Sequence, residues 1–353
     1  MKKLRIAHVA PLFESVPPKL YGGTERVVSF LTEELIRMGH EVTLFASGDS
    51  TTHANLVPVC EKALRLDPDC VDPLSHHIVQ LQMVQELSHN FHVVHYHTDY
   101  LHYPLSRFSP VAHLTTLHGR LDIPELKPLY NLFRDVPVVS ISENQRSPFP
   151  DINWVGNVYH GLPVDLLMPN FSQGQYLAFL GRISPEKGID NAIAIARRCG
   201  IPLRIAAKID KADKDYFDHK IEPLLDDPMI EYVGEIGENE KGEFLGNAMA
   251  LLFPIAWPEP FGLVMIESLA CGTPVIAYDR GSVPEILEHG KTGFIVSSVD
   301  EGVEAVRNIP YIKREDCRLA FEQRFTSTIM ASAYVNLYKK ILNVSESPII
   351  VNY

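Results

Sequence analysis

The sequence lacks an excess of positive charge. Its 353 residues include 32 lysines and arginines against 44 aspartates and glutamates, which gives a formal net charge of -12 at pH 7. Proteins that bind DNA or RNA depend largely on an excess of cations that neutralise phosphates, so no nucleic-acid partner is expected. A small anionic molecule remains compatible with this composition, because a few cations placed together can outweigh the overall charge locally.

Cysteine is also scarce, and long apolar runs are missing. The five cysteines are an odd number without a CxxC spacing, which argues against a disulfide framework and a structural zinc site and fits reduced thiols in a cytoplasmic protein. No stretch approaches the roughly 18 apolar residues of a membrane span, and no cluster of lysines and arginines marks a docking segment. We therefore expect no integral membrane segment, whereas peripheral contact with a membrane stays open.

Two nucleotide-binding fingerprints are missing as well. No GxGxxG follows a predicted strand, which removes the usual evidence for a dehydrogenase-type dinucleotide site. Gly290-Lys291-Thr292 resembles the end of a P-loop, but Glu285 stands where that motif requires glycine. We expect an ordinary turn there, followed by a strand over Phe294–Val296.

What the sequence does contain is a regular alternation of strands and helices. A predicted helix, Thr24–Met38, carries apolar residues on one face, and we expect Thr24 to cap its start and Gly39 to end it. Strand, helix and strand in this order predict a parallel sheet covered by helices on both faces. The strands predicted in this half are Arg5–Ala10, Glu41–Ala46, Phe91–His97, His113–Leu117 and Pro137–Ile141.

A segment rich in glycine and proline, residues 161–175, interrupts this pattern before a second series begins. We expect an α/β fold with two Rossmann-like βαβ domains facing a central cleft, namely residues 1–165 with 330–353, and residues 166–329. Ligands are expected at the C-terminal ends of the strands. The elements predicted in the second series are the strands Tyr176–Leu180, Leu203–Ala207, Ile230–Val233, Leu251–Ile255 and Pro274–Tyr278, and a final helix, Ile329–Leu342.

Two loops at such strand ends carry candidate ligand-binding residues. Gly22 and Gly23 precede the first helix, where glycine lets a ligand approach the backbone, although paired glycines are also common in ordinary turns. In the loop 181–188, Arg182 and Lys187 can neutralise a diphosphate without a metal; alternatively they form surface ion pairs. These two cations predict a local concentration of positive charge in an acidic chain.

The strongest signal is the segment 258–267, where Glu259 lies in a loop at a helix start and Glu267 lies within the helix. Carboxylates in these places can accept hydrogen bonds from sugar or ribose hydroxyls, and the helix start can hold phosphate. The ordinary alternative is that Glu259 only stabilises the helix start and that Glu267 forms a surface ion pair.

The spacing of Glu259 and Glu267 resembles the EX7E motif of retaining GT-B glycosyltransferases, in particular family 4. The resemblance extends in order over nearly the whole chain and implies the GT-B fold. The residues that carry it are the segment Glu259–Ala277, Gly181-Arg182 with Pro185–Gly188, Gly22-Gly23 with Glu25, Thr116–Gly119, Gly281 with Pro284-Glu285, and Gly290 with Gly293-Phe294.

The resemblance also implies roles for individual residues. His118 would lie near the reacting centre of the sugar, the final helix would return to the first domain, and catalysis would need no metal. The donor contacts it implies are Arg182, Lys187, Gly22 and Gly23 at the diphosphate, Glu267 at the ribose hydroxyls, and Glu259 with the backbone of Phe261, Gly262 and Leu263 at the sugar and phosphate.

Near residue 160 the chain departs from the family. Many relatives have Asn-Gly-Val-Asp, whereas this chain has Tyr159-His160-Gly161-Leu162-Pro163-Val164-Asp165. His160 replaces the asparagine, and the role of this turn stays open.

Histidines gather in the first half of the chain, where thirteen of the fifteen precede residue 161. His95 and His97 share one face of a predicted strand, but His92 points to the other face and no carboxylate or cysteine pattern completes a metal site. We expect a polar strand end and no metal. The predicted acceptor contacts are His97, Asp99 and His102.

The expected activity is transfer of a hexose from a nucleotide-diphosphate sugar to an acceptor hydroxyl, with retention of the anomeric configuration and no cofactor or metal. Family frequency favours a UDP-sugar, and the product would belong to glycan or glycoconjugate biosynthesis. Two alternatives stay open. A GT-B sugar-nucleotide epimerase would convert the donor without an acceptor, and a non-catalytic nucleotide-sugar binding protein would release no nucleotide diphosphate.

Overall fold

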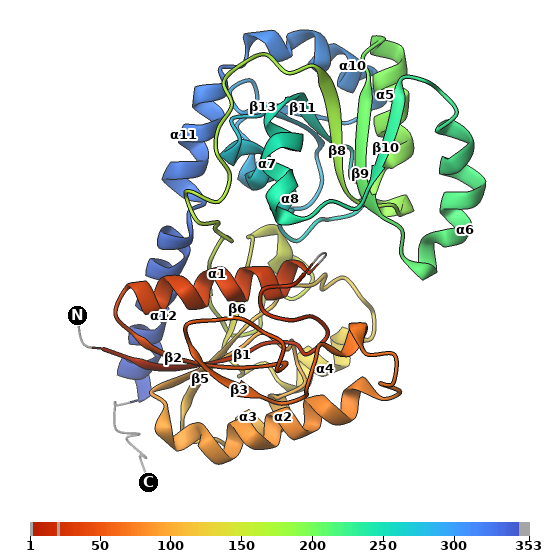
Figure 1. Ribbon diagram of the computed structural model, residues 1–353. Helices are drawn as coiled ribbons and strands as arrows, with labels where there is room; N and C mark the ends of the chain where they lie inside the picture. Colours follow the sequence, from red (N-terminus) through yellow and green to blue (C-terminus); the bar gives the residue numbers. More distant parts are fainter. Residues whose placement is uncertain (1–2, 20–21, 346–353) are drawn as a thin grey trace. The chain divides into compact units, whose positions relative to one another are not determined.

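The computed structural model describes residues 3–19 and 22–345, which form two compact units (Figure 1). Unit 1 comprises residues 1–161 and 327–353, and unit 2 comprises residues 162–326. The predicted boundaries lay a few residues later, and part of the predicted first domain, residues 346–353, lies outside the described residues. The Leu162 N–H donates to the Phe325 carbonyl at 2.9 Å, so both chain crossings are tied together in unit 2.

The core of unit 1 is a seven-stranded parallel sheet. Its strand order is β3-β2-β1-β4-β5-β6-β7, so the chain builds outward in one direction from β1 and then in the other from β4. The strands are β1 (Arg5–Val9), β2 (Glu41–Ala46), β3 (Asn55–Pro58), β4 (Val93–Tyr96), β5 (Ala112–Thr116), β6 (Val138–Ser140) and β7 (Trp154–Asn157).

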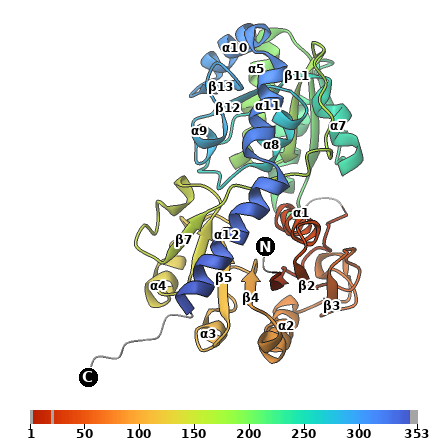
Figure 2. The same ribbon diagram turned by 90° about the vertical axis from the view of Figure 1, so that its left-hand side faces the viewer.

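Helices cover both faces of this sheet, as Figures 1 and 2 show. Val28 of the first helix packs on one face with Leu44, whereas Leu81 packs on the other face with Val9. The final helix, in blue, lies beside the first helix on the same face. The helices of unit 1 are α1 (Gly23–Arg37), α2 (Pro73–Leu87), α3 (Tyr103–Ser106), α4 (Leu126–Leu132) and α12 (Ser327–Ser345).

The ends of α1 correct one prediction and confirm another. Gly22, and not Thr24, is the N-cap residue, and no side chain caps the helix start. At the other end Gly39 has φ of 89°, the left-handed conformation expected of a glycine that follows a helix.

Unit 2 is built on a six-stranded parallel sheet of order β10-β9-β8-β11-β12-β13. Its strands are β8 (Tyr176–Arg182), β9 (Leu203–Lys208), β10 (Ile230–Gly234), β11 (Ala248–Phe253), β12 (Val275–Tyr278) and β13 (Gly293–Val296). Its helices are α5 (Ile189–Cys199), α6 (Lys214–Tyr216), α7 (Glu238–Gly246), α8 (Leu263–Ala270), α9 (Val283–Ile286), α10 (Val299–Asn308) and α11 (Arg314–Arg324). Two parallel-sheet α/β units confirm the predicted fold class.

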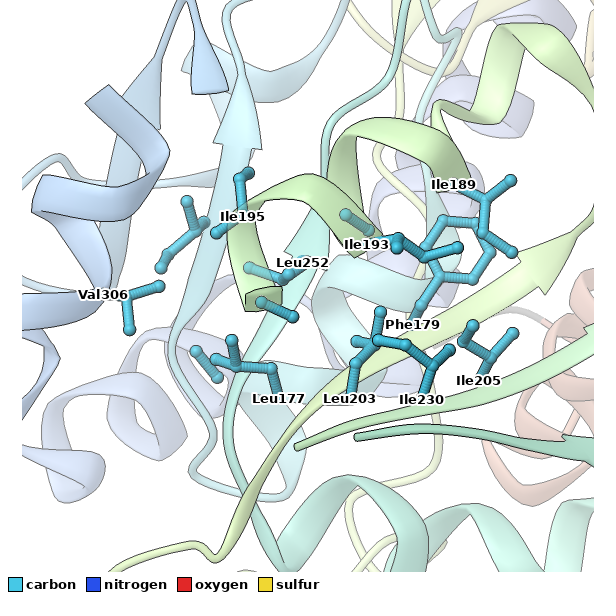
Figure 3. Close-up of a cluster of buried hydrophobic side chains, with 14 of the residues drawn as sticks. Leu177, Phe179, Ile189, Ile193, Ile195, Leu203, Ile205, Ile230, Leu252 and Val306 are labelled. Atoms are coloured by element: carbon cyan, nitrogen blue, oxygen red, sulfur yellow. The ribbon is translucent and has the colours of Figure 1, made fainter. Parts of the chain in front are cut away.

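Apolar side chains from α5, α10 and the strands form the main core of unit 2 (Figure 3). Ile193 and Ile195 of α5 lie over Leu177 and Leu203 of the sheet, and each of the four side chains is 1% exposed or less. Burial of each such side chain contributes about 1.5–3 kcal/mol, so this layer holds the sheet and the helices in place.

The sequence predictions missed two strands of unit 1. Strands β3 and β7 are short, lie at the two edges of the sheet and have no fully buried residue, so their apolar patterns are weak.

Among residues 3–19 and 22–345, no helix combines the length and the apolar character that crossing a bilayer requires.

Replacing Ile193 with alanine tests the packing of unit 2. Ile193 is 1% exposed, so Ile193→Ala should lower the free energy of unfolding by about 2–4 kcal/mol through lost burial and a residual cavity. The measurement is chemical denaturation followed by circular dichroism. Leu319→Ala on α11, where the side chain is 46% exposed, is the matched control and should cost less than about 1 kcal/mol. Equal losses in the two variants would contradict the assigned core.

Candidate functional site

The candidate donor residues of unit 2 lie where its strand order reverses. Strands β8 and β11 are neighbours, and the chain builds outward from them in opposite directions. Open parallel sheets bind ligands outside the carboxyl ends of their strands at such a point, because the flanking loops diverge there. The loop after β8 carries Lys187, and the loop after β11 carries Glu259. The topology therefore brings these predicted residues to one place.

Lys187 and Glu259 form a close ion pair. The Lys187 Nζ lies 2.6 Å from Oε2 of Glu259, and the two side chains are 15% and 12% exposed. The Trp257 Nε1–H donates to the same carboxylate oxygen at 3.0 Å, and Lys187 Nζ lies 5.3 Å from the centre of the Trp257 ring. These contacts fix the carboxylate and leave Oε1 able to accept a hydrogen bond from a ligand.

Two glycines let the loops around this pair approach closely. A Cβ at Gly281, whose φ is 57°, would lie 2.3 Å from the backbone N and O of Glu259. A Cβ at Gly188, whose φ is 69°, would lie 2.0 Å from the Pro254 carbonyl oxygen. The Ser282 N–H donates to the Glu259 carbonyl at 3.0 Å, so the backbone of the next loop holds Glu259 in position.

The start of α8 follows this loop directly. Phe261 is buried, and its carbonyl accepts a hydrogen bond from the Ser282 hydroxyl at 2.7 Å. Gly262 adopts φ of 79° and is the N-cap residue, so Leu263 is the first helical residue. The first N–H groups of a helix have no partner within the helix and carry a partial positive charge. This arrangement can hold an anionic group beside Glu259.

The charge around Arg182 differs from the prediction. Its guanidinium contacts Glu186, and it lies 3.6 Å from Asp210 and 3.5 Å from Asp213. Lys208 pairs with Asp210 at 3.0 Å, so three carboxylates face two cations. The predicted concentration of positive charge is therefore wrong for this loop.

The acidic groups near Arg182 also affect one another. Partial burial raises the pKa of Asp213, and the charges of Glu186 and Asp210 raise it further against the opposing effect of Arg182. Asp210 and Asp213 follow β9, far from the 181–188 motif in sequence, so the motif gave no sign of them. A ligand phosphate would compete with these carboxylates for Arg182.

Glu267 has a different partner. Its Oε1 lies 2.6 Å from Nζ of Lys241 on α7, with the two side chains 5% and 12% exposed. The ordinary alternative of an ion pair is thus realised, but the pair is largely buried rather than on the surface. No sequence motif pointed to Lys241.

In unit 1 the strand order reverses between β1 and β4, and the predicted glycines follow β1. Gly22 caps α1, and its carbonyl accepts a hydrogen bond from the Arg26 N–H at 3.2 Å. A Cβ at Gly22 would lie 2.7 Å from Cβ of Pro18, so close packing within the loop already requires glycine here. Gly23 is the first residue of the helix.

Three predicted residues meet after β4 and β5. The His97 Nδ1 and the His118 Nε2 lie 2.9 Å apart, within hydrogen-bond distance. Asp99 is exposed with φ of 49°, and its carboxyl accepts the main-chain N–H of His118. His160, whose role the sequence left open, stacks on His118 with ring centres 5.2 Å apart. Its position after β7 explains why sequence alone did not link it to His118.

His102 is placed differently from the other predicted acceptor contacts. Its ring is buried and stacks on Tyr96 at 3.6 Å. Nδ1 bonds the Ser106 hydroxyl at 2.7 Å, and Nε2 bonds the Thr115 hydroxyl at 2.6 Å. Both ring nitrogens are therefore engaged in the core of unit 1, which argues against a contact with an acceptor.

His8, His95 and His97 form the one group of potential metal ligands found among the described residues, with one ligand atom each within 4.8 Å of the others. His95 and His97 share a strand face, as predicted. The Tyr338 hydroxyl bonds Nδ1 of His95 at 2.8 Å and lies 3.4 Å from Nε2 of His8. Hydrogen bonding to Tyr338 thus accounts for the positions of His95 and His8 without a metal.

Burial keeps these rings neutral at pH 7. It lowers the pKa of His8 and of His118 to about 3, and it holds the pKa values of His95, His97 and His160 well below the usual 6.5. Unit 1 thus contains a group of hydrogen-bonded, uncharged imidazoles beside its candidate site.

Solved structures share this architecture. A glycosyltransferase involved in avilamycin A biosynthesis, AviGT4, has a TM-score of 0.74 at 24% identity, over 96% of this chain and 98% of that one. The Anabaena protein HepE, solved with UDP and glucose, has a TM-score of 0.75 at 17% identity, over 96% of this chain and 100% of that one. Each unit has a parallel sheet whose strand order reverses once, and candidate ligand-binding loops lie at that point. Together with the similarity to these structures, this architecture defines the GT-B fold.

Family models match both units. The model of Glycosyltransferase Family 4 matches residues 21–144, and the model of Glycosyl transferases group 1 matches residues 169–317. The chain is a GT-B glycosyltransferase of group 1. A 41.2 kDa uncharacterized protein of the cps region of Klebsiella pneumoniae is 30% identical over 169 residues, 46% of each chain. The match thus spans less than half the length of that relative.

The buried histidines predict a loss of stability in acid. A histidine whose pKa is about 3 when folded and about 6.5 when unfolded stabilises the fold fully above pH 6.5 and progressively less as the pH falls toward 3. For His8, the loss between pH 7 and pH 5 should be about 2 kcal/mol.

The Nδ1 atom of His8 lies 2.8 Å from the Thr32 hydroxyl, and the variant His8→Asn removes the titrating group but keeps a polar group near this hydroxyl. Denaturation at pH 7 and pH 5 should show that the acid-induced loss shrinks by about 2 kcal/mol relative to wild type. His89→Asn, at an exposed position, is the control and should leave the loss unchanged. An unchanged loss in His8→Asn would show that His8 is not buried as a neutral ring.

Proposed function

We propose that the chain transfers a hexose from a nucleotide-diphosphate sugar, a UDP-sugar, to an acceptor hydroxyl with retention of the anomeric configuration and without a metal. The observation that carries this proposal is the gathering of Lys187, Glu259 and the start of α8 where the strand order of unit 2 reverses. HepE, which shares the fold, was solved with UDP and glucose, and this favours uridine as the donor base.

The five cysteines are all unpaired, in keeping with a reducing cytoplasm.

Departure of the nucleotide diphosphate is the first chemical demand of such a reaction. Lys187 and the N–H groups at the start of α8 would stabilise the negative charge that develops on the leaving phosphate. Arg182 would join them once phosphate oxygens displace its carboxylate partners. Glu267 would bind the ribose hydroxyls beside its Lys241 partner. These groups supply positive charge and hydrogen bonds, which is the role a metal plays elsewhere.

Glu259 is better placed to orient the sugar than to attack it. Lys187 and Trp257 both bond its Oε2, which lowers the nucleophilicity of the carboxylate and fixes its direction. Oε1 would accept a hydrogen bond from a sugar hydroxyl. We therefore favour a same-face route in which a leaving phosphate oxygen receives the acceptor proton while the acceptor oxygen bonds to the anomeric carbon.

In unit 1, His118 would contact the sugar near its reacting carbon. Asp99 and His97 are its neighbours, and of the three acceptor contacts predicted from sequence only Asp99 is exposed. We propose Asp99 as the acceptor contact and assign His102 to the core. Gly22 and Gly23 would approach the diphosphate through their backbone.

A panel of nucleotide sugars tests the donor. Bound ligand stabilises a folded protein by mass action, by about 2.7 kcal/mol at one hundred times its Kd, so UDP-sugars should raise the Tm above the values seen with GDP-, ADP- and TDP-sugars. A larger shift with another base would correct the base alone. No shift with any nucleotide sugar would overturn the donor assignment.

A measurement of product release distinguishes a transferase from the two alternatives, an epimerase and a binding protein. Release of UDP that depends on an added acceptor and persists in EDTA is the expected result. Conversion of the donor without acceptor would identify an epimerase, and binding without UDP release across an acceptor panel would identify a binding protein.

The variant Lys187→Ala tests the diphosphate contact. Loss of one charge-stabilising donor typically costs 100-fold or more, so kcat/KM should fall by about 100-fold. Glu259→Gln removes the partner charge but keeps Lys187, and it should reduce kcat while nucleotide affinity stays within about threefold. Lys291→Ala, an exposed lysine of the same unit, is the control. A kcat/KM within about threefold of wild type for Lys187→Ala would refute the assignment.

A further inference from the structure

Two buried ring nitrogens near the candidate site have no hydrogen-bond partner. They are Nε2 of His97 and Nδ1 of His118, and neither has a partner among the described residues. The other nitrogens of the same two rings face each other at 2.9 Å. Both rings are neutral, because burial lowers both pKa values, so each ring carries one proton.

Only two arrangements of protons satisfy the short contact. In the first, Nδ1–H of His97 donates to Nε2 of His118, and the proton of His118 is on Nδ1. In the second, Nε2–H of His118 donates to Nδ1 of His97, and the proton of His97 is on Nε2. Each arrangement leaves one N–H group without an acceptor, so the environment of that group decides between them.

The surroundings of His97 disfavour an unpaired N–H group. The ring is 2% exposed, and it packs against the rings of His8 and His95, with centres 5.3 Å and 4.0 Å away. No acceptor within hydrogen-bond distance of its Nε2 is found in the described part of the chain. An N–H group at this position would be buried without an acceptor and would cost its desolvation penalty in full.

The surroundings of His118 favour a proton on Nδ1. Nδ1 of His118 is buried, but the residue as a whole is partly exposed whereas His97 is 2% exposed, so an unpaired N–H group is less costly on His118. Nδ1 is the ring nitrogen closer to the main chain, and the Asp99 carboxyl accepts the main-chain N–H of this same residue. A carboxylate on that side stabilises a proton at Nδ1 more than a lone pair.

We infer that His97 fixes the tautomer of His118, by donating from Nδ1 to Nε2, so that His118 presents its Nδ1–H group as a hydrogen-bond donor. The hydrogen bond made by one ring nitrogen sets the protonation of the other, as is general for histidine. The group that His118 takes is therefore an oxygen acceptor, such as a sugar hydroxyl or a phosphate oxygen of the donor. His97 is a positioning residue, and this assignment rests on the proposed function of His118.

The tautomer can be read directly in the full chain without any ligand. In protein labelled with ¹⁵N at histidine, the two ring nitrogens of a neutral imidazole have distinct shifts, and a His118→Gln variant assigns the signals of His118. The expected result at pH 7.5 is a protonated Nδ1 and an unprotonated Nε2 in His118. A proton on Nε2 of His118 in the wild-type chain would overturn the inference, whether or not the protein is a transferase.

Matched variants separate positioning from folding. The amide of His97→Asn can donate from the position of Nδ1, so it should keep the Nδ1–H tautomer of His118 and a kcat within about threefold of wild type. His97→Leu removes the donor and should mix the tautomers, lower kcat about 10-fold or more and leave the KM for UDP-glucose within about threefold. His102→Leu, at a second buried histidine, is the control and should not change the tautomer.

The outcomes distinguish the inference from the proposed function. If His97→Leu lowers kcat no more than His102→Leu and His118 keeps its tautomer, His97 has a structural role only and the inference fails. If the predicted tautomer responds to His97 as described but no donor and acceptor pair gives UDP release, the proposed function fails while the tautomer assignment holds.

Discussion

The direction of strand ends is the constraint on which the candidate donor site depends. All strands of unit 2 are parallel, so their carboxyl ends share one edge, and only between β8 and β11 do the two following loops diverge. The Lys187–Glu259 pair spans these loops, and the loop after β8 at Gly188 and the loop after β12 at Gly281 both approach the loop after β11 closely. A change of topology at this point would remove the site even if every side chain were kept.

The candidate residues of the two units lie in different electrostatic environments. In unit 2 Arg182 and Lys187 are already paired with carboxylates, so an anionic ligand at either cation would have to compete with these partners. In unit 1 the polar groups are neutral imidazoles whose hydrogen bonds set which atoms donate. The paired charges and the neutral imidazoles thus belong to separate units of the chain.

Sequence predicted those features that depend on neighbouring residues. The parallel fold followed from alternating patterns, and β2 and the left-handed Gly39 were predicted at their observed positions. The cap of α1 was not, because loop packing at Gly22 decided it. Sequence could not predict contacts between segments that are distant in the chain. Examples are the contacts of Asp213 with Arg182, of Lys241 with Glu267 and of His160 with His118. Arg182 and Lys187 predicted a cationic loop, and Asp210 and Asp213, which follow another strand, offset its charge.

The last helix has a consequence for how the chain acquires its structure. Tyr338 of α12 supplies the hydroxyl that bonds His95 and approaches His8, near the other end of the sequence. During synthesis these imidazoles emerge from the ribosome some 240 residues or more before their partner. Unit 2 is continuous and can fold as it emerges, whereas the core of unit 1 stays incomplete until α12 has been synthesised. Completion of this histidine network therefore follows the synthesis of unit 2.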